Sequence, residues 1–471
     1  MTEMGGMQED PLALLPELVL LAGAVLGLLL GLWTPQRRQI RVRILAATAA
    51  VGSAGAAAAA LGDPDRAVFG GTWIIDSTTG AVRVTVALAT AAAILLASSS
   101  LAGHPRETEA YVLMLLGALG AIALAASGDL LLLVAAYLLA SVPLYALAGF
   151  AKDALGVEAT LKYYLMGAFV GVLMLVGVAT LVLSAGVTGY DGLARQLPTA
   201  PTPLLAVGVL TVFAGVAFKA GAVPVHFWVP DVAAGSTGWA AAFITTIPKI
   251  GAVAAAFRLA AAPFADVPLD VPLLVAIIAA ASMTLGNLAA FQQTDVLRLL
   301  AYSTVSQVGY LFMVVAVAAR SDLASPALAI YLAGYAVTNL GAFAAAAALP
   351  DRTSIAEWSQ AAGRHRWLVV SLVVCLLGLV GTPPSAVFVG KLSVFAAAAD
   401  GSFGWLVVVA AINTVASLFY YLRWIGPAFR ASTAAVGGSV AVAAMRSAYV
   451  AASASLVLGV AAGLWLSAVS G

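Results

Sequence analysis

Long apolar stretches, separated by short polar connections, run through most of this chain. A helix needs about 20 mainly apolar residues to cross a bilayer, and the 471 residues can be divided into about fourteen stretches of that kind. They fall at residues 12–33, 42–61, 78–101, 110–127, 130–150, 158–184, 203–229, 238–260, 271–291, 296–318, 324–349, 367–399, 403–426 and 445–468. The pattern predicts an all-α polytopic membrane protein with about fourteen transmembrane helices.

Two of these stretches are interrupted by glycine and proline without a long polar loop. In the first, Gly221, Pro224 and Pro230 fall between apolar runs, and in the second Pro383 and Pro384 do. Unwound backbone at membrane depth persists only where it lines protein or a wet cavity. Paired breaks in two halves of a chain are typical of transporters with inverted repeats and ion sites near the midplane. We therefore expect one broken helix near 219–230 and another near 381–391.

The composition of the chain is unlike that of a soluble domain, and it offers no residues for a nucleic-acid, metal or cofactor site. Hydrophobic residues make up 63% of the chain and charged residues 9%, whereas charged residues make up about 25% of an ordinary soluble domain. A net charge of +1 gives no footprint for nucleic acid. The single cysteine, Cys375, allows neither an internal disulfide nor a thiolate cluster, and three scattered histidines form no zinc or haem motif. We expect no metal or cofactor in this chain.

Arginine and lysine in the connections predict the orientation, because the cytoplasmic loops of membrane proteins are enriched in both. Odd-numbered connections carry thirteen such residues and even-numbered connections carry four. The thirteen are Arg37, Arg38, Arg41, Arg43, Arg106, Lys152, Arg298, Arg352, Arg364, Arg366, Arg423, Arg430 and Arg446. The four are Arg66, Arg195, Arg258 and Arg320; Arg83 falls within the third stretch and is not counted. Both termini are therefore expected outside, with an acidic tail of Glu3, Glu9 and Asp10 before a first helix that is retained.

The chain has only five lysines, and four of them, Lys162, Lys219, Lys249 and Lys391, stand in apolar surroundings. The fifth, Lys152, is interpreted as a loop charge. A lysine at bilayer depth costs about 2.5–3.5 kcal/mol by insertion scales, so it usually faces protein or water and has a function. Burial disfavours the charged form of an amine, which suits a lysine to proton exchange. The alternative, for Lys162 above all, is a lysine near a helix end whose amine reaches the interface.

Other polar residues near these lysines have two interpretations each. His226 lies between Pro224 and Pro230, where an imidazole either passes protons between buried sites or satisfies backbone groups freed by the break. Asp231 is interpreted as a helix cap. A further set lies in or beside the spans, either on a proton path or in helix-packing contacts: Asp129, Tyr137, Tyr302, Ser303, Gln307, Tyr335 and Asn339.

Five segments carry a resemblance to a known family: FKAGAVPVHFWVPDVAAG, MTLGNLAAFQQTDVLRLLAYSTVSQVGYLFM, NLGAFA, GTPPSAVFVGK and YYLRW, in this order. Over residues 14–424 the chain resembles the antiporter-like subunit N of the proton-pumping NADH-quinone oxidoreductase, respiratory complex I. The resemblance implies fourteen helices, two inverted five-helix repeats, and two half-channels joined by a central line of lysines. Lys162, Lys219, Lys249 and Lys391 match the functional lysines of the family, and His226 matches its bridging histidine. Lysine rather than glutamate at 391 argues against subunit M.

On this resemblance the chain divides into N-terminal helices 1–3 at residues 1–107, a first repeat at 108–262, a second repeat at 263–430, and helix 14 at 431–471. The expected function is proton translocation in the membrane arm of a complex I-type enzyme, driven by quinone reduction in other subunits. NADH, FMN, iron–sulfur clusters and quinone are expected in those partner subunits, and the expected location is a bacterial cell membrane. Two alternatives stay open: a subunit of a multi-subunit cation/proton antiporter, and a non-conducting structural paralogue.

Three positions depart from the family pattern. The family carries a glutamate five residues before the proline of a SLPLY-like motif, and that position is Leu138 here. Asp129, nine residues earlier, is about 13 Å away along a helix. We therefore expect no carboxylate of the fifth span to pair with Lys162. The lysine of an LKRLLAYS-like motif is Leu297 and the histidine before its GY is Gln307, which together with Leu138 motivate the non-conducting alternative.

Overall fold

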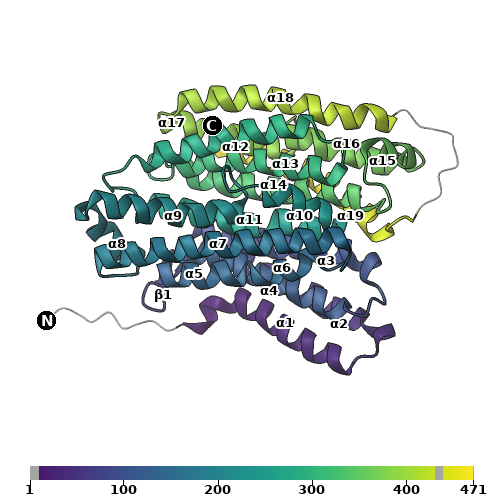
Figure 1. Ribbon diagram of the computed structural model, residues 1–471, viewed down its shortest axis with the longest axis horizontal. Helices are drawn as coiled ribbons and strands as arrows, with labels where there is room; N and C mark the ends of the chain where they lie inside the picture. Colours follow the sequence, from purple (N-terminus) through teal and green to yellow (C-terminus); the bar gives the residue numbers. More distant parts are fainter. Residues whose placement is uncertain (1–9, 430–438, 470–471) are drawn as a thin grey trace.

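The structure, a computed structural model, describes residues 10–429 and 439–469, with side chains described up to residue 463. Figure 1 shows long helices lying side by side along the longest axis of the molecule. Within the described residues, thirteen helices are long and apolar enough to cross a membrane. The predicted all-α membrane fold is confirmed. Glu3, Glu9 and Arg430, used above to predict the orientation, lie outside the described residues.

The helices lie in the following order. They are α1 (Leu15–Trp33), α2 (Ile40–Ala59), α3 (Ser77–Leu101), α4 (Glu107–Ala126), α5 (Leu130–Leu139), α6 (Val142–Ala148), α7 (Ala154–Ala185), α8 (Tyr190–Gln196), α9 (Thr202–Ala220), α10 (Trp228–Gly235), α11 (Gly238–Ala261), α12 (Val271–Phe291), α13 (Val296–Ala316), α14 (Ala324–Ala347), α15 (Ile355–Ala362), α16 (Arg366–Val380), α17 (Ala386–Asp400), α18 (Gly404–Phe429) and α19 (Val442–Val469). Short 3-10 turns lie at Pro11–Leu14, Gln36–Arg38 and Leu197–Thr199, and β1 (Arg66–Val68) pairs antiparallel with β2 (Trp73–Ile75).

Both predicted interruptions are present. The first separates α9 from α10, and the second separates α16 from α17. Each of the upstream helices ends at a glycine with positive φ, Gly221 at 77° and Gly381 at 94°. Glycine takes this left-handed conformation without the penalty that a Cβ brings, which is why it ends helices so often. The fifth predicted span is also divided, because Pro143 begins a new helix, α6, directly after α5.

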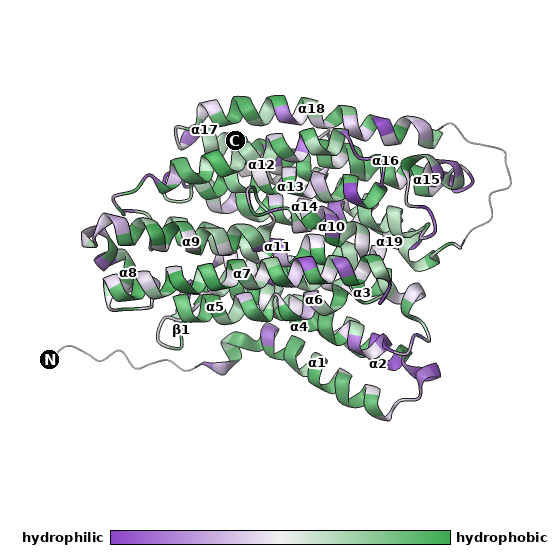
Figure 2. Cartoon of the chain, in the orientation of Figure 1, coloured by the Kyte–Doolittle hydropathy of each residue, from purple (hydrophilic) through white to green (hydrophobic). Residues whose placement is uncertain are grey.

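The innermost helices are α11 and α13. An 18-residue window of α11 is 100% buried inside the molecule and one of α13 is 94% buried, against 39% for α1 and 33% for α18. Figure 2 shows the outer helices coloured predominantly hydrophobic along their length. A surface of this kind faces lipid or a neighbouring subunit. The polar side chains of α11 and α13 must therefore find partners within the chain.

Aspartates start several of the helices, because a carboxylate accepts hydrogen bonds from the free amides of a first turn. Asp76 accepts from the amide of Thr79 at 2.8 Å at the start of α3. Asp129 caps α5 in the same way, with 2.7 Å to the amide of Leu131. The contact that the structure gives Asp129 is therefore a helix cap, which was not among the interpretations made for it.

Two arginines within apolar helices are held by carboxylates from distant parts of the chain. Arg83 in α3 contacts Glu17 in α1 at 2.6 Å, and both residues are buried. Arg258 in α11 contacts Asp76 at 2.9 Å, and its Nε donates to the carbonyl of Ala125 at the end of α4. The assignment of Arg258 to a connection was therefore wrong: it is only 8% exposed. Pairing and hydrogen bonding make these buried charges tolerable.

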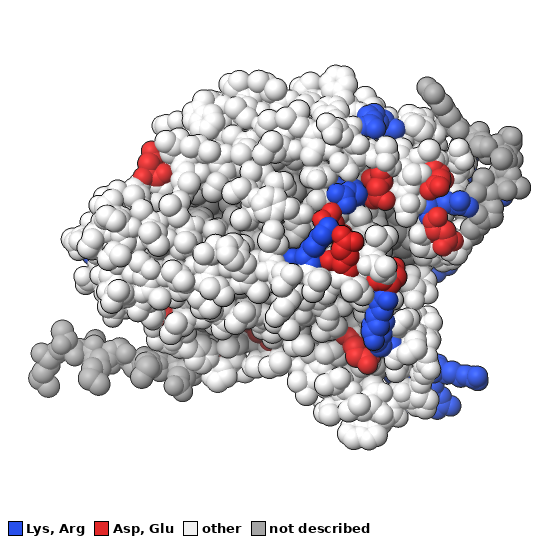
Figure 3. All heavy atoms as spheres, in the orientation of Figure 1, with Lys and Arg blue, Asp and Glu red and all other residues white. Residues whose placement is uncertain are grey.

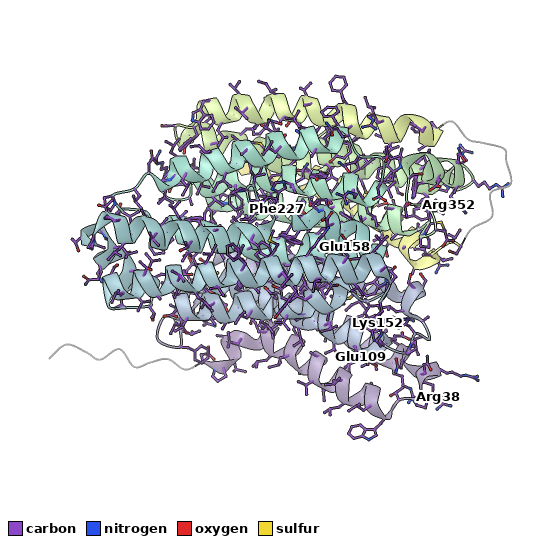
Figure 4. All side chains as sticks on the ribbon, viewed as in Figure 1. Arg38, Glu109, Lys152, Glu158, Phe227 and Arg352 are labelled. Atoms are coloured by element: carbon purple, nitrogen blue, oxygen red, sulfur yellow. The ribbon has the colours of Figure 1, made fainter. Side chains whose placement is uncertain are left out.

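Charged side chains gather at one end of the helical bundle. Figure 3 shows most of the visible Lys, Arg, Asp and Glu toward the right-hand end, with one group nearer the middle of this face. In the same view, Figure 4 places Arg38, Lys152 and Arg352 at that end. All three come from connections that were predicted to share one side of the membrane.

Candidate functional site

Lys219 occupies the last turn of α9 and is only 1% exposed. Its Nζ donates to the carbonyl oxygen of Ala140 at 3.1 Å. In a continuous helix that carbonyl would bond the amide of Leu144, but this amide donates to Ser141 at the junction of α5 and α6. The junction thus leaves an acceptor free, and the lysine uses it.

Lys249 follows Pro248 inside α11 and is fully buried. Its Nζ donates to the hydroxyl of Thr304 in α13 at 2.9 Å. The amine also lies against Gly221, where a Cβ would come within 2.9 Å of Nζ. Gly221 therefore both allows the left-handed turn that ends α9 and leaves room for the amine.

Lys391 has the same relation to the second break. It lies in α17, is 3% exposed, and donates to the carbonyls of Leu379 and Val380 at 3.2 and 2.9 Å. These carbonyls belong to the last turn of α16, whose partial negative charge favours a cation. A Cβ on Gly381 would come within 2.9 Å of the Lys391 Cδ, and the ring centroid of Tyr310 lies 3.9 Å from Nζ.

An aromatic pair lies between the first two buried amines. The rings of Tyr163 and Trp228 stack with centroids 4.3 Å apart and planes 15° apart. Tyr163 lies 5.8 Å from the Lys219 amine, and Trp228 lies 6.0 Å from the Lys249 amine. Each amine therefore faces one side of the stack, within reach of a cation–π interaction.

One face of α13 connects the second amine to the third. Thr304 binds Lys249, and Gln307, three residues later, donates to the carbonyl of Leu379 at 2.8 Å. The same carbonyl accepts from Lys391. Residues three apart in a helix share a face, so α13 presents a short polar row between the two lysines.

Further hydroxyls and amides surround this row. Ser303 and Tyr421 share a hydrogen bond, and the hydroxyl of Tyr331 donates to Gln307 at 2.6 Å. Two other predicted residues bind α11 instead, because Tyr335 donates to the carbonyl of Thr245 and Asn339 to the hydroxyl of Thr246. These groups are buried and neutral, so they supply hydrogen bonds but no counter-charge.

Three lysines are buried without an opposite charge. Among the described residues, no carboxylate forms an ion pair with Lys219, Lys249 or Lys391. A buried charge without a partner is strongly disfavoured, so such a group exchanges its proton more readily than an exposed one. This arrangement is suited to taking up and releasing protons.

Lys162 differs from the prediction. Its side chain is 50% exposed, and its Nζ lies 2.8 Å from Glu158 and 3.0 Å from Asp231. Asp231 also binds Arg298 at 2.9 Å, so it is an ion-pair partner and not a helix cap. Counting carboxylates only in the fifth span missed both partners of Lys162. Figure 4 labels Glu158 near the middle of the view, where Figure 3 shows the separate group of charges.

His226 lies in the first break, between α9 and α10, and is half-buried. Its Nδ1 is buried without a hydrogen-bond partner of good geometry among the described residues. Figure 4 places the next residue, Phe227, near the middle of the molecule. The histidine therefore lies well away from the charged end of the bundle.

Of the positions that depart from the family pattern, Gln307 shares the Leu379 carbonyl with Lys391, whereas the other two, Leu138 and Leu297, carry apolar side chains. Leu138 points outward from α5 and is 51% exposed. Its neighbour Tyr137 turns inward, with its ring centroid 5.1 Å from the Lys219 amine. Leu297 lines a cavity of about 520 Å³ that also contains His104 and Trp239.

Sequence comparison assigns the family. The sequence model of the family described as NADH:quinone oxidoreductase/Mrp antiporter, transmembrane, matches residues 127–417 of this chain. The chain belongs to this family. The predicted resemblance is thereby confirmed, and the matched residues include all four lysines of the prediction.

Curated relatives are similar over nearly their whole length. NADH-quinone oxidoreductase subunit N 1 of Streptomyces griseus is 54% identical over 424 residues, which is 90% of each chain. Subunit N of a Mycobacterium species is 48% identical over 419 residues, or 89% of each chain.

Within the described residues, no group of three or more His, Cys, Asp or Glu side chains is placed to hold a metal ion.

Solved structures share the fold. A chain of respiratory complex I from Thermus thermophilus with bound aureothin matches with a TM-score of 0.82 and 28% identity, covering 95% of this chain and 98% of that one. A chain of the Mrp complex from Dietzia matches with a TM-score of 0.82, covering 97% and 96%. At 19% identity, the second match concerns the fold alone.

Proposed function

We propose that this chain is a proton-translocating membrane-arm subunit of a complex I-type NADH-quinone oxidoreductase. Its relatives at 54% and 48% identity are subunits N of such enzymes. Quinone reduction takes place in partner subunits, which carry the NADH, FMN and iron–sulfur sites. This chain contributes proton transfer and no redox chemistry of its own.

The observation that carries the proposal is the set of three buried lysines that have no carboxylate partner among the described residues. Lys219 and Lys249 carry and pass protons, and Lys391 exchanges them with the outside. His226 bridges the first two sites from the break. Lys162, which is paired with Asp231 in α10, modulates the first site through that short helix.

We also propose two inverted repeats, at 108–262 and 263–430, after N-terminal helices at 1–107 and before a last helix at 431–471. The support is the parallel construction of the two breaks. Each ends a helix at a left-handed glycine, and each glycine lies against a lysine side chain.

For localisation, we propose a bacterial cell membrane with both chain termini outside. The bias of Arg and Lys toward the odd-numbered connections supports this orientation. Arg258 is buried in a helix and no longer counts among the residues of the even-numbered connections, so the bias toward the odd-numbered connections becomes stronger. Other membrane-arm subunits are the expected partners, because the exposed apolar faces of the outer helices fit contact with neighbouring membrane proteins.

The deciding experiment is proton uptake into membrane vesicles driven by NADH, comparing the native chain with Lys219→Met. Methionine keeps much of the reach of lysine but carries no proton. We expect at least a tenfold fall in uptake, while NADH oxidation with an artificial electron acceptor and assembly of the complex stay unchanged. The matched control is Lys152→Met, which removes a lysine from a connection.

A non-conducting role is the second candidate, favoured by the outward-facing Leu138 in place of the family glutamate. Unchanged uptake in Lys219→Met and in Lys391→Ala would establish that role. A subunit of a cation/proton antiporter would instead copurify without redox subunits.

A further inference from the structure

Lys219 has no carboxylate partner among the described residues, and other groups surround its amine. The residue at the pattern position, Leu138, points away from the amine. The preceding residue, Tyr137, points toward it, and Tyr163 from α7 lies on the same side. Besides the Ala140 carbonyl, the Lys219 amine therefore has two phenol rings from two helices near it.

Both phenols are incomplete in their hydrogen bonding. Tyr137 is 3% exposed and Tyr163 is 0% exposed, yet neither hydroxyl has a hydrogen-bond partner among the described residues. A buried hydroxyl left without a partner costs about 1–3 kcal/mol. Buried water commonly satisfies such groups, and it needs two to four polar neighbours. The Lys219 amine, 5.1 and 5.8 Å from the two ring centroids, is the nearby polar group that could share such a water with the hydroxyls.

A third tyrosine extends the cluster toward the surface. Tyr145 in α6 is half-buried and packs edge-on against Tyr163, with ring centroids 4.8 Å apart. The Tyr145 hydroxyl lies directly over Gly167, where a Cβ would collide with it. Glycine at this position of α7 is therefore required to admit the third phenol.

We propose that the hydroxyls of Tyr137, Tyr163 and Tyr145 hold buried water against Lys219 and form the path by which protons reach it. The proposal rests on the proton-translocating function above and identifies the groups that serve its first lysine. It also assigns an entry side, the face between α6 and α7.

The transfer step balances without forming a phenolate. Each hydroxyl oxygen accepts a proton from a water molecule on the surface side and releases its own proton to the next oxygen. The last water gives a proton to the neutral amine of Lys219, and the resulting ammonium donates to Ala140. The return of each hydroxyl to its starting orientation completes the cycle, and water is the only co-reactant.

The test uses the assembled complex in vesicles, with Tyr137→Phe, Tyr163→Phe and the double variant. Phenylalanine keeps the ring and its cation–π contact and removes only the hydroxyl. We expect about a threefold fall in NADH-driven proton uptake for each single variant and at least tenfold for the double variant. Tyr111→Phe is the matched control, because it removes a buried hydroxyl that binds Glu107, far from the lysines in sequence.

A second readout separates this proposal from the function on which it rests. High-resolution electron cryomicroscopy of the native complex should resolve water within hydrogen-bond distance of the two phenols and Lys219. A dry cluster, or normal uptake in the double variant while Lys219→Met abolishes uptake, overturns the phenol path alone. Normal uptake in Lys219→Met overturns the proposed function as well. Tyr137→Glu, which sets a carboxylate at the inward position, should restore uptake to the Tyr163→Phe variant.

Discussion

The amine of Lys249 occupies the space that a side chain on Gly221 would need, since a Cβ there would lie 2.9 Å from Nζ. This contact joins the end of α9 to the middle of α11. Glycine is therefore needed at position 221 for two reasons: the left-handed backbone turn of the first break, and the space that the buried lysine occupies. A substitution at Gly221 therefore tests both together.

Gly221→Ala should reduce NADH-driven proton uptake at least tenfold. A non-glycine residue at a φ of 77° is strained, at a cost of about 1–2 kcal/mol, and the new methyl group must displace the lysine amine. The measurement is proton uptake normalised to the amount of assembled complex. Gly55→Ala in α2 is the control, because a Cβ there meets nothing within 4 Å; an equal loss in both variants would contradict the interpretation.

Thr304→Val should slow proton transfer from Lys249 toward Lys391. Valine has nearly the same shape as threonine but cannot accept the 2.9 Å hydrogen bond from the Lys249 amine. Leaving a buried amine without that acceptor costs about 1–3 kcal/mol, so we expect a fall in uptake of about fivefold to a hundredfold. Thr90→Val is the control, since Thr90 is also buried but bonds only its own helix, at the Val86 carbonyl. Equal rates for the two variants would remove Thr304 from the path.

Glu17→Gln should destabilise the N-terminal helices more than loss of the whole pair does. Arg83 would then be buried without an opposite charge, and breaking a buried pair in this way costs about 3–5 kcal/mol. Replacing both residues, by Glu17→Leu with Arg83→Met, should cost much less because no charge remains buried. Thermal unfolding of the assembled complex gives the comparison. A double variant less stable than Glu17→Gln would contradict this account.

The sequence predicted the helices well because hydrophobicity and length alone determine which segments can cross a bilayer. Every predicted span contains a helix of the structure, and both breaks lie where glycine and proline interrupt the apolar runs. The burial of Lys219, Lys249 and Lys391 also followed from their apolar neighbours in sequence.

Contacts between distant segments were beyond the sequence patterns. Arg83 was left out of the orientation count because it falls within the third stretch, and its partner, Glu17, stands 66 residues earlier, where no local pattern points to it. For Lys162, no carboxylate of the fifth span was expected to pair, and both partners lie elsewhere: Glu158 in its own helix, and Asp231 69 residues later, on a helix that begins only after the break. The direction in which a side chain points also could not be predicted from the sequence. Motif spacing identifies Leu138 as the position of the family glutamate, but in the packed helices it is Tyr137 that points toward Lys219. Such pairings depend on how helices pack, which local pattern does not specify.

The absence of carboxylates beside the three buried lysines also limits how many of them can be charged together. Like charges repel strongly in a medium of low dielectric constant, and groups that interact in this way titrate as a set and not one by one. A proton on one lysine therefore makes a proton on the next less favourable. On the proposed function, a proton that arrives at one lysine would therefore favour the departure of a proton from its neighbour. In the proposed relay, this repulsion would order the filling and emptying of the three lysines, because no carboxylate of the described residues is paired with them to offset it.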